Sequence, residues 1–275
     1  MGKYMVGIVI LNYMNYNETI SCVDSVLEQK GINYSIVVVD NGSVNESYKV
    51  LAKRYYKNPD VHVIHAGKNY GFAKGNNIGI KYVRERFGAK FVLLINSDTQ
   101  MIYENYIEML VSQYKKGIGV IGSEIILRNG SKQKPYVECV GFPGTLVRYA
   151  DLFNQLYGTG TIHKQTERRI SRKGYTTILH GCAFMLTPDY FEQYDGLYSK
   201  TFLYCEESLL YIMCERAGLK QLYTDITGIY HKEDQSSLYL YNNNNTKKLK
   251  YIIKSYKYVV LQSFINYIIR KGILK

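Results

Sequence analysis

Apolar runs rich in Val and Ile alternate along the chain with segments whose apolar residues recur at helical spacing. The runs predict buried strands at Val6–Leu11, Ser35–Val39, Val61–Ile64, Phe91–Ile95 and Ile118–Ser123. The segments between them predict helices at Glu18–Lys30, Gly71–Phe87 and Ile102–Lys116. Gly31 is placed to end the first of these helices. This alternation is typical of an α/β fold in which a mostly parallel sheet is flanked by helices.

Polar residues follow several predicted strands at the point where each strand ends. They are Asn12, Asp40 and the run Asn96-Ser97-Asp98. Because ligands of such sheets bind beyond the carboxyl ends of the strands, we expect these residues to surround one crevice. For Asp40 two interpretations stay open, a carboxylate that binds a ribose or base and a residue of the Asp-Asn-Gly-Ser turn. Asp98 is either a ligand of Mg²⁺ or Mn²⁺ or a helix cap.

The loop after the first strand lacks the glycines of the two common phosphate-binding motifs. It reads Asn-Tyr-Met-Asn-Tyr-Asn, which excludes both G-x-G-x-x-G and Walker A. A bound diphosphate would need another source of positive charge, most simply a divalent metal. Further along, Gly71, Gly75 and Gly79 share one face of a predicted helix, which permits tight packing on the sheet. Asn69 and Asn76 in the same stretch are candidate ligands.

The second half of the chain is less regular. Ser123–Thr177 carries several glycines and predicts an insertion with mobile loops. Regular patterning returns at Cys182–Leu186, Pro188–Tyr194 and Glu206–Ala217. We expect one domain over residues 1–241, with a nucleotide-binding half of about 1–123 and an acceptor half of about 124–241.

A basic amphipathic helix is predicted for the C-terminal segment, residues 246–275. Its apolar residues share one face at a spacing of three or four residues: Ile253, Tyr256, Val260, Phe264 and Tyr267. Lysines and arginines surround this face. Such a helix either lies on an anionic membrane surface or packs on its own domain with its lysines in solvent, and both interpretations stay open.

Composition narrows the classes of function. The chain has 275 residues, 46% of them hydrophobic, which suits a globular domain, and no apolar run reaches the roughly 18 residues of a membrane span. The net charge of +12 favours an anionic partner. Because no nucleic-acid-binding motif accompanies this charge, we do not expect the partner to be a nucleic acid. No apolar signal-peptide region precedes the first strand, so we expect a cytoplasmic protein. The five cysteines form no C-x-x-C pair and predict buried thiols.

Together and in order, these motifs resemble those of the family 2 glycosyltransferases, inverting enzymes of the GT-A (Rossmann-like) fold that use nucleotide-sugars. The resemblance covers most of Val6–Ser237. It is carried by Val9–Tyr13, Val38–Ser43, Asn69–Gly79, Asn96–Asp98, Gly181–Leu186, Phe202–Glu207 and His231. Among the members of this family, the chain looks most like the rhamnosyltransferase-like enzymes of bacterial polysaccharide synthesis.

The resemblance implies a role for each matched position. It assigns nucleotide-sugar binding to Asn12, Tyr13, Asp40, Asn69, Gly71, Asn76, Asn96, Ser97 and Asp98. It assigns acceptor binding to His180, Gly181 and Tyr204, and the binding of Mn²⁺ or Mg²⁺ to Asp98 and His231. Glu207 takes the place of the catalytic base, with Glu206 beside it. Without the surrounding motif, two adjacent glutamates would equally suit the acidic first turn of a helix.

The implied reaction is the inverting transfer of a hexose, with rhamnose among the candidates, from a dTDP- or UDP-sugar to a hydroxyl of an acceptor. We expect a lipid-linked saccharide acceptor in capsule or other surface polysaccharide synthesis, and a protein held peripherally on the inner face of the membrane. A homodimer stays open. Met14, Asn96 and Glu207 depart from the family pattern and keep open an inactive nucleotide-sugar or glycan-binding protein. A nucleotidyltransferase would need a glycine-rich basic loop after the first strand, and the sequence has no such loop there.

Overall fold

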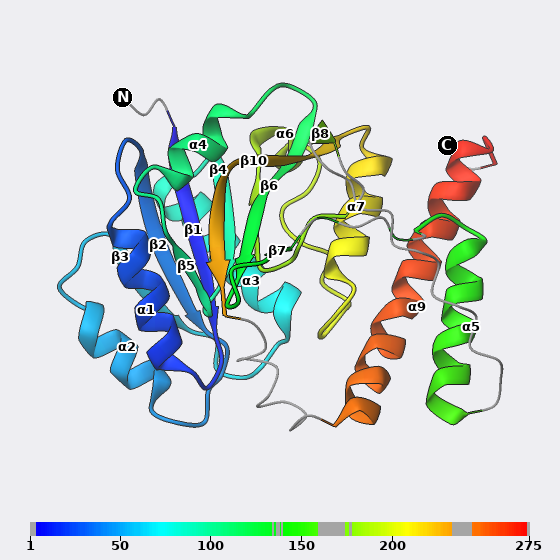
Figure 1. Cartoon of the computed structure of the whole chain (residues 1–275), viewed down its shortest axis with the longest axis horizontal. Helices are drawn as coiled ribbons and strands as arrows, with labels where there is room; N and C mark the ends of the chain where they lie inside the picture. The colour runs from blue at the N-terminus through cyan, green and yellow to red at the C-terminus, as the bar shows by residue number, and fades with distance from the viewer. Residues whose placement is uncertain are drawn as a thin grey trace.

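The computed structural model places the described strands in one sheet between helices (Figure 1). The structure describes residues 4–133, 135, 138, 140–158, 174–175, 178–232 and 244–273. The strands are β1 (Met5–Asn12), β2 (Asn33–Asp40), β3 (Val61–His65), β4 (Phe91–Asn96), β5 (Thr99–Met101), β6 (Ile118–Leu127), β7 (Lys132–Gln133), β8 (Gly174–Tyr175), β9 (Ala183–Leu186) and β10 (Lys220–His231). The helices are α1 (Tyr16–Leu27), α2 (Ser47–Tyr55), α3 (Phe72–Phe87), α4 (Tyr106–Ser112), α5 (Gly144–Tyr157), α6 (Pro188–Phe191), α7 (Glu206–Arg216) and α9 (Asn245–Arg270).

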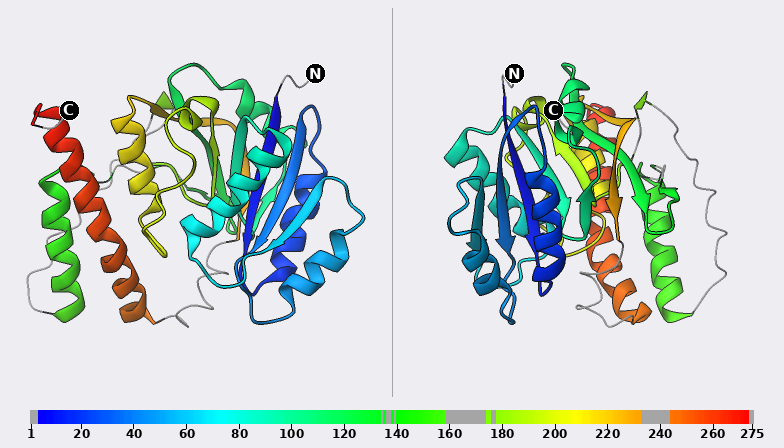
Figure 2. Two further views of the ribbon diagram at one scale, coloured as in Figure 1. Left: turned by 180° about the vertical axis from the view of Figure 1, so that it is seen from behind. Right: turned by 60° about the vertical axis from the view of Figure 1, so that its left-hand side comes forward.

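The sheet joins a parallel half to a mixed half in the order β3-β2-β1-β4-β9-β6-β10-β5. The strands β1 to β4 pair in parallel, as their apolar runs predict. β9 then lies antiparallel between β4 and β6, while β6 and β10 pair in parallel. The two views in Figure 2 show the sheet twisting between helices on both of its faces. The predicted α/β fold with a sheet flanked by helices is confirmed, and its second half is mixed.

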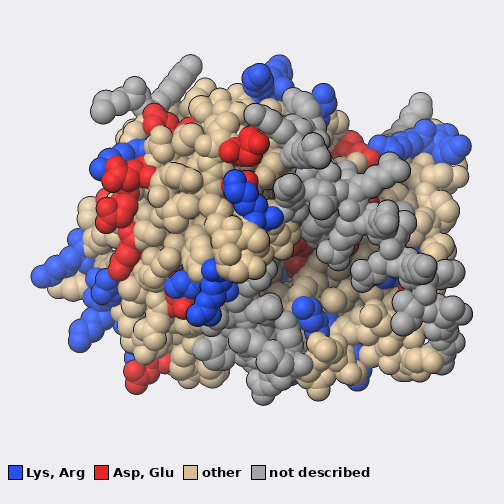
Figure 3. Space-filling model, viewed as in Figure 1, with Lys and Arg blue, Asp and Glu red and all other residues tan. Residues whose placement is uncertain are grey.

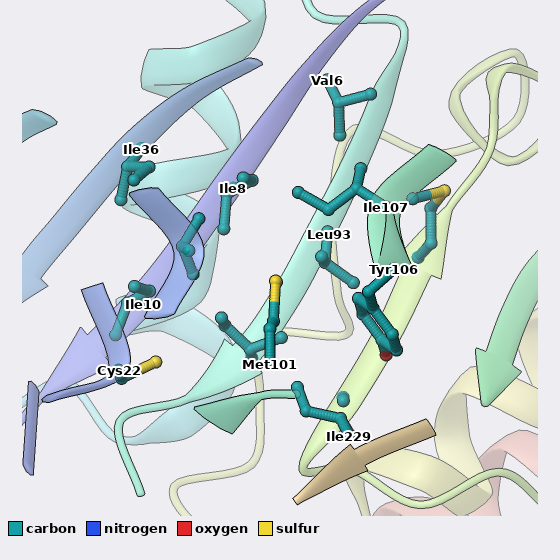
Figure 4. Packing of buried hydrophobic residues seen from close by; sticks show 14 of the residues in the cluster. Val6, Ile8, Ile10, Cys22, Ile36, Leu93, Met101, Tyr106, Ile107 and Ile229 are labelled. Carbon is teal, nitrogen blue, oxygen red and sulfur yellow. The ribbon is translucent and has the colours of Figure 1, made fainter. Parts of the chain in front are cut away.

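The alternation of side chains along β1 explains why helices cover both faces of the sheet. Ile8 and Ile10 point to the face covered by α1, where they belong to one buried cluster with Cys22, as Figure 4 shows. Val9 points to the other face and belongs to a second cluster with Ile80 of α3. All five side chains have no exposed surface. Two buried faces in one strand account for the continuous apolar run in the sequence.

The predicted glycine face of α3 packs directly on the strands. A Cβ added to Gly75 would lie 2.6 Å from Leu11 Cδ1. A Cβ added to Gly79 would collide with the side chain of Val9. The glycines therefore let α3 approach the sheet more closely than side chains would permit.

The segment after β4 differs from its predicted helix. Thr99–Met101 forms β5, which pairs antiparallel with Ile229–His231 of β10. The helix that follows, α4, begins only at Tyr106, with Asn105 at its N-cap. Asp98 therefore caps no helix. The periodicity of residues 102–116 could not reveal β5, because the strand exists only through its pairing with a distant part of the chain.

The end of α1 and the presence of two further helices also differ from the sequence expectations. α1 ends at Leu27, and the amide of Gln29 donates to Val26 O at 3.1 Å, so Gly31 does not end this helix. Its φ of +79° instead serves the turn before β2. α2 was not predicted, and α5 lies inside the segment expected to be irregular loop. The part of that segment at residues 159–173 lies outside the described residues.

The C-terminal helix α9 packs against α5 and α7 (Figures 1 and 2). Ile253 and Tyr256 of the predicted apolar face are buried, whereas Phe264 and Tyr267 are 41% and 38% exposed. Beyond Tyr256 the buried face passes through polar residues, among them Ser263, whose hydroxyl bonds to the Thr145 hydroxyl of α5 at 2.7 Å. The first part of the predicted apolar face, at Ile253 and Tyr256, therefore packs on the protein's own domain. Among the described residues, no helix has the length and hydropathy of a membrane span.

Candidate active site

A cavity of about 430 Å³ opens where β1, β2 and β4 end. Most of the predicted site residues line it: Tyr13, Asn69, Gly71, Asn96, Ser97, Asp98, His180, Gly181, Tyr204, Glu206, Glu207 and His231. They come from both halves of the chain. The residues predicted for nucleotide-sugar binding and those predicted for catalysis therefore share one cavity.

Asp40 and Asn12 are placed differently from the prediction, because they bond to each other inside the sheet edge. Asn12 Nδ2 donates to Asp40 Oδ2 at 2.7 Å. The other carboxylate oxygen of Asp40 accepts from the Ser43 amide at 3.1 Å and lies 3.0 Å from His65 Nδ1. Asp40 is fully buried and does not line the cavity. Its position matches the turn interpretation, in which the carboxylate orders the Asp-Asn-Gly-Ser turn.

Asn41, which the sequence analysis did not single out, faces the cavity from this turn. Its Nδ2 donates to Asn69 Oδ1 at 3.1 Å and to Gly71 O at 3.2 Å. Its Oδ1 accepts from the Tyr70 amide at 3.1 Å. Asp40 is the last residue of β2 and its buried side chain bonds within the sheet edge, whereas Asn41 follows the strand and faces the cavity.

Asn76 also lies away from the cavity. Its side chain is 1% exposed and donates to Phe72 O, one turn earlier in α3, at 3.0 Å. An asparagine that satisfies its own helix in this way has a structural role. Further residues that line the cavity without having been predicted are Leu11, Phe72, Gln133, Cys182, Phe202 and Leu203. All but Gln133 lie within the stretches that carry the family resemblance, but most are apolar, so their side chains gave no chemical signal of a site.

Asp98 and His231 meet at one edge of the cavity because β5 pairs with β10. His231 Nε2 lies 3.4 Å from Asp98 Oδ1, and both side chains are largely buried. Among the described residues, neither Asp98 Oδ1 nor His231 Nδ1 has a hydrogen-bond partner. Burial alone lowers the pKa of His231, but interactions with Asp98 and Cys182 outweigh it and raise this pKa to about 10. Within the described residues no group of three His, Cys, Asp or Glu side chains is arranged around a metal position.

Glu206 and Glu207 begin α7 on the opposite side of the cavity. Burial raises the pKa of Glu206 to about 8, with a further contribution from the charge of Glu207. Burial also raises the pKa of Glu207, partly offset by backbone amide donors that include Gly181. Glu206 Oε1 has no hydrogen-bond partner among the described residues. Buried carboxyl groups with raised pKa values in a cavity are typical of acid–base chemistry.

Gly181 allows Glu207 to take its position. A Cβ added to Gly181 would lie 2.5 Å from Glu207 Oε1, so a larger residue would displace the carboxylate. The glycine also donates its backbone N–H to this carboxylate. The Gly181 motif and the paired glutamates are thus two parts of one structure, although a loop, a strand and a helix separate them in the sequence.

Known proteins resemble this chain in sequence and in fold. The low-salt glycan biosynthesis hexosyltransferase Agl10 of Haloferax volcanii is 29% identical over 171 residues, which cover 62% of this chain and 50% of Agl10. The chain therefore spans about half the length of this relative. Mannosyltransferase PcManGT from Pyrobaculum calidifontis, in complex with GDP-Man and Mn²⁺, superposes with a TM-score of 0.58 at 10% identity over 94% of this chain and 73% of that chain.

TarS of S. aureus, as residues 1–349 in complex with UDP-GlcNAc, has a TM-score of 0.57 at 13% identity over 84% of this chain and 59% of that chain. At such low identity these structures show a shared fold, and the GT-A fold expected from the sequence is confirmed. The sequence model described as Glycosyl transferase family 2 matches residues 7–195, well over half of the chain. The chain therefore belongs to glycosyl transferase family 2.

Proposed function

We propose that the protein is an inverting glycosyltransferase that moves a hexose from a nucleoside-diphosphate sugar to a hydroxyl group of a saccharide acceptor. The observation that carries this function is the single cavity that unites Asp98 and His231 with Glu206 and Glu207. One wall offers polar groups suited to a nucleotide and its phosphates. The other offers buried carboxyl groups suited to a proton transfer.

Glu207 acts as the general base. The acceptor hydroxyl attacks the anomeric carbon on the side opposite the diphosphate, a C–O bond forms there, and the bond to the diphosphate breaks. Glu207 takes the hydroxyl proton, a step worth roughly 10²–10⁴-fold in rate. Glu206, whose pKa of about 8 keeps it protonated at neutral pH, donates a hydrogen bond to a bound sugar.

The residues at Asp98 fit a divalent metal ion, Mn²⁺ or Mg²⁺. A buried carboxylate oxygen without a hydrogen-bond partner is a suitable donor, and the neighbouring imidazole of His231 would become one when the ion displaces its proton. Two protein ligands are sufficient where substrate phosphates complete the coordination. When bound, the ion would neutralise charge on the leaving diphosphate. Asn96, which lines the same edge of the cavity, carries no charge, so Asp98 is the anionic ligand there.

The donor is a dTDP-, UDP- or GDP-sugar, with rhamnose among the candidate sugars. Support comes from Agl10, which is a hexosyltransferase, and from PcManGT and TarS, which hold GDP-Man and UDP-GlcNAc. The acceptor is a lipid-linked saccharide at the inner face of the membrane, in surface polysaccharide synthesis. A basic chain with an exposed apolar helical surface suits such an acceptor.

That surface lies on α5 and α9, the two helices at the right of Figure 1, and Figure 3 shows Lys and Arg gathered at the upper end of this side. Its apolar residues are each 38–56% exposed: Leu146, Val147, Phe153, Leu261, Phe264, Tyr267 and Ile269. Lys257 and Lys271 are exposed near them on α9. Apolar side chains bordered by cations favour the surface of an anionic bilayer.

Vesicle sedimentation tests this membrane contact. We expect more binding to vesicles of phosphatidylcholine with phosphatidylglycerol than to phosphatidylcholine alone. Replacing Leu261 and Phe264 by serine should reduce binding, whereas Val44→Ser, which changes an 87% exposed residue near α2, should not. Equal binding by both variants would place the contact elsewhere.

The transfer reaction itself is tested by a thermal-shift screen of UDP-, GDP- and dTDP-hexoses, each with Mn²⁺ and with EDTA. We expect one nucleotide group to raise the melting temperature, and slow hydrolysis of its nucleotide-sugar to release the free sugar. Product analysis with saccharide acceptors then identifies the bond formed. Binding without hydrolysis or transfer would favour an inactive nucleotide-sugar-binding protein, and no binding at all would contradict both functions.

A further inference from the structure

The loop that precedes the paired glutamates forms the acceptor wall of the cavity. Phe202, Leu203 and Tyr204 line the cavity, and α7 begins two residues later at Glu206. Tyr204 and Cys205 have left-handed φ angles of 72° and 69°. This conformation is unfavourable for residues other than glycine and persists only when surrounding contacts hold it. The contacts that hold this loop therefore decide where the two carboxyl groups point.

One set of contacts comes from the start of α3. The amide of Phe72 donates to Phe202 O at 2.8 Å. Gly71, with a φ of +83°, packs so closely on the Phe202 backbone that a Cβ there would collide with it. This side of the loop is thus tied to the nucleotide-binding half of the chain.

The second set comes from α9. The Ser255 hydroxyl donates to Leu203 O at 2.7 Å, and Ser255 is 3% exposed. The Tyr251 ring stacks on Phe202 with ring centroids 5.7 Å apart. The Lys248 ammonium lies 5.7 Å from the centroid of the Tyr204 ring. Three consecutive loop residues are each held by a different side chain of this one helix.

α9 is also fixed to the helix that carries the glutamates. Arg216 of α7 donates to Gln262 Oε1 at 2.8 Å and to Asn266 Oδ1 at 2.7 Å. Asn266 Nδ2 donates in turn to Ile212 O at 3.1 Å. The loop and α7 are therefore held against the same rigid partner.

We propose that α9, which lies outside the family match at residues 7–195, is the positioning element of the acceptor wall, with Ser255 as its main contact. Ser255, assisted by Tyr251 and Lys248, holds Phe202–Tyr204 and so orients Glu207 toward the acceptor hydroxyl. As far as it concerns catalysis, this inference rests on the proposed function.

A pair of serine variants separates positioning from general stability. Ser255→Ala removes the hydroxyl that bonds to the loop, and Ser263→Ala removes an equally buried hydroxyl of α9 that bonds to Thr145 of α5. Ser255→Thr keeps a hydroxyl donor at the first position. We expect both alanine variants to lower the melting temperature, since Ser255→Ala breaks the hydrogen bond to Leu203 O and Ser263→Ala breaks the bond to Thr145 and a local bond to Val260 O.

Hydrogen–deuterium exchange measured by mass spectrometry reports on the loop without any substrate. Ser255→Ala should speed exchange in peptides covering residues 202–207 by about fivefold, while Ser263→Ala leaves it unchanged. Equal acceleration in both variants would overturn the inference. The exchange rates test the contacts between α9 and the loop even if the protein transfers no sugar.

Hydrolysis of UDP-GlcNAc, UDP-glucose, GDP-mannose and dTDP-rhamnose supplies the catalytic measurement. For whichever of these the wild type hydrolyses, Ser255→Ala should lower kcat about tenfold with KM within about twofold, because only the carboxyl groups are displaced. Ser255→Thr should recover most of the rate. An accelerated loop with unchanged kcat would overturn the positioning role, whereas a wild type that hydrolyses none of the four contradicts the proposed function instead.

Discussion

The two walls of the cavity are built on opposite principles. On the nucleotide side, Asp40 and Asn41 use their side-chain oxygens and amide groups in hydrogen bonds that close the turn after β2. On the acceptor side, Tyr204 and Cys205 have left-handed backbone angles, and Glu206 keeps a buried oxygen without a partner among the described residues. The turn on the nucleotide side is complete by itself, although Asp98 Oδ1 on the same side also lacks a hydrogen-bond partner among the described residues. The acceptor side differs in adding left-handed backbone angles at Tyr204 and Cys205 to its unpaired carboxylate oxygen.

This difference indicates where the chemistry takes place. Unfavourable backbone angles and buried carboxyl groups persist in a fold when they serve binding or catalysis. The nucleotide side takes its order from the parallel strands β1, β2 and β4. The acceptor wall depends on contacts from α3, α7 and α9, and changes in it should affect rate more than affinity.

Replacing Glu207 by Gln should give the largest effect and tests the acceptor wall directly. Transfer should fall roughly 10²–10⁴-fold because an amide cannot take the hydroxyl proton. Calorimetry should find nucleotide affinity unchanged, since Glu207 lies across the cavity from the nucleotide wall. Glu192→Gln, the same change at an exposed residue of another helix end, serves as the control. Transfer retained in Glu207→Gln would remove this residue from the role of base.

Replacing Asp98 by Ala tests the other wall. We expect the affinity for a nucleoside diphosphate in the presence of Mn²⁺ to fall at least about tenfold, because the ion loses its anionic ligand. In EDTA the wild type and the variant should bind equally weakly. Calorimetry in both buffers measures this, with Asp60→Ala at the exposed end of another loop as a charge-matched control. Equal affinities of wild type and variant with Mn²⁺ would contradict metal binding at Asp98.

The sequence predicted the strands of the first half of the molecule well, but among the site residues it was more accurate on the acceptor side. All the predicted acceptor and catalytic residues line the cavity, whereas Asn12, Asp40 and Asn76 do not. β1 to β4 were readable because buried parallel strands appear as continuous apolar runs. β5 was missed because it exists only through pairing with β10, and His231 meets Asp98 only through that pairing. Asn41 was missed because both residues of Asp40-Asn41 suit a turn, and only the direction of each side chain separates them.

The face of α9 was misplaced for a related reason. The apolar spacing grouped Phe264 on one face with Ile253 and Tyr256, and packing on the domain and contact with a membrane were both open for that face. In the structure Ser263 and Asn266 are buried there instead, each with hydrogen-bond partners on α5 or α7. Buried polar residues are compatible with packing when they are paired, but hydropathy alone cannot find their partners.

A substitution at Gly79 tests whether the nucleotide wall depends on the close approach of α3. Gly79→Ala places a Cβ against Val9, and overpacking of this kind should reduce the free energy of unfolding by about 1–3 kcal/mol. Gly141→Ala adds a Cβ with no heavy atom within 4 Å and should change stability far less. Urea denaturation measures both. Equal stability of the two variants would mean that α3 shifts to accept the added methyl group.

The last expected effect concerns the buried carboxyl of Glu206 and the pH dependence of stability. Its pKa is about 8 in the folded protein and near 4.5 in the unfolded chain, so between these values the folded state binds more protons. The free energy of unfolding should therefore decrease as the pH rises from about 5 to 8. Glu206→Gln, which carries no titrating proton, should flatten this decrease, whereas exposed Glu192→Gln should leave it as in the wild type. Urea denaturation at several pH values measures the slope. Parallel curves for wild type and Glu206→Gln would show that this carboxyl is hydrated, and the contrast between the two walls would then rest on backbone conformation alone.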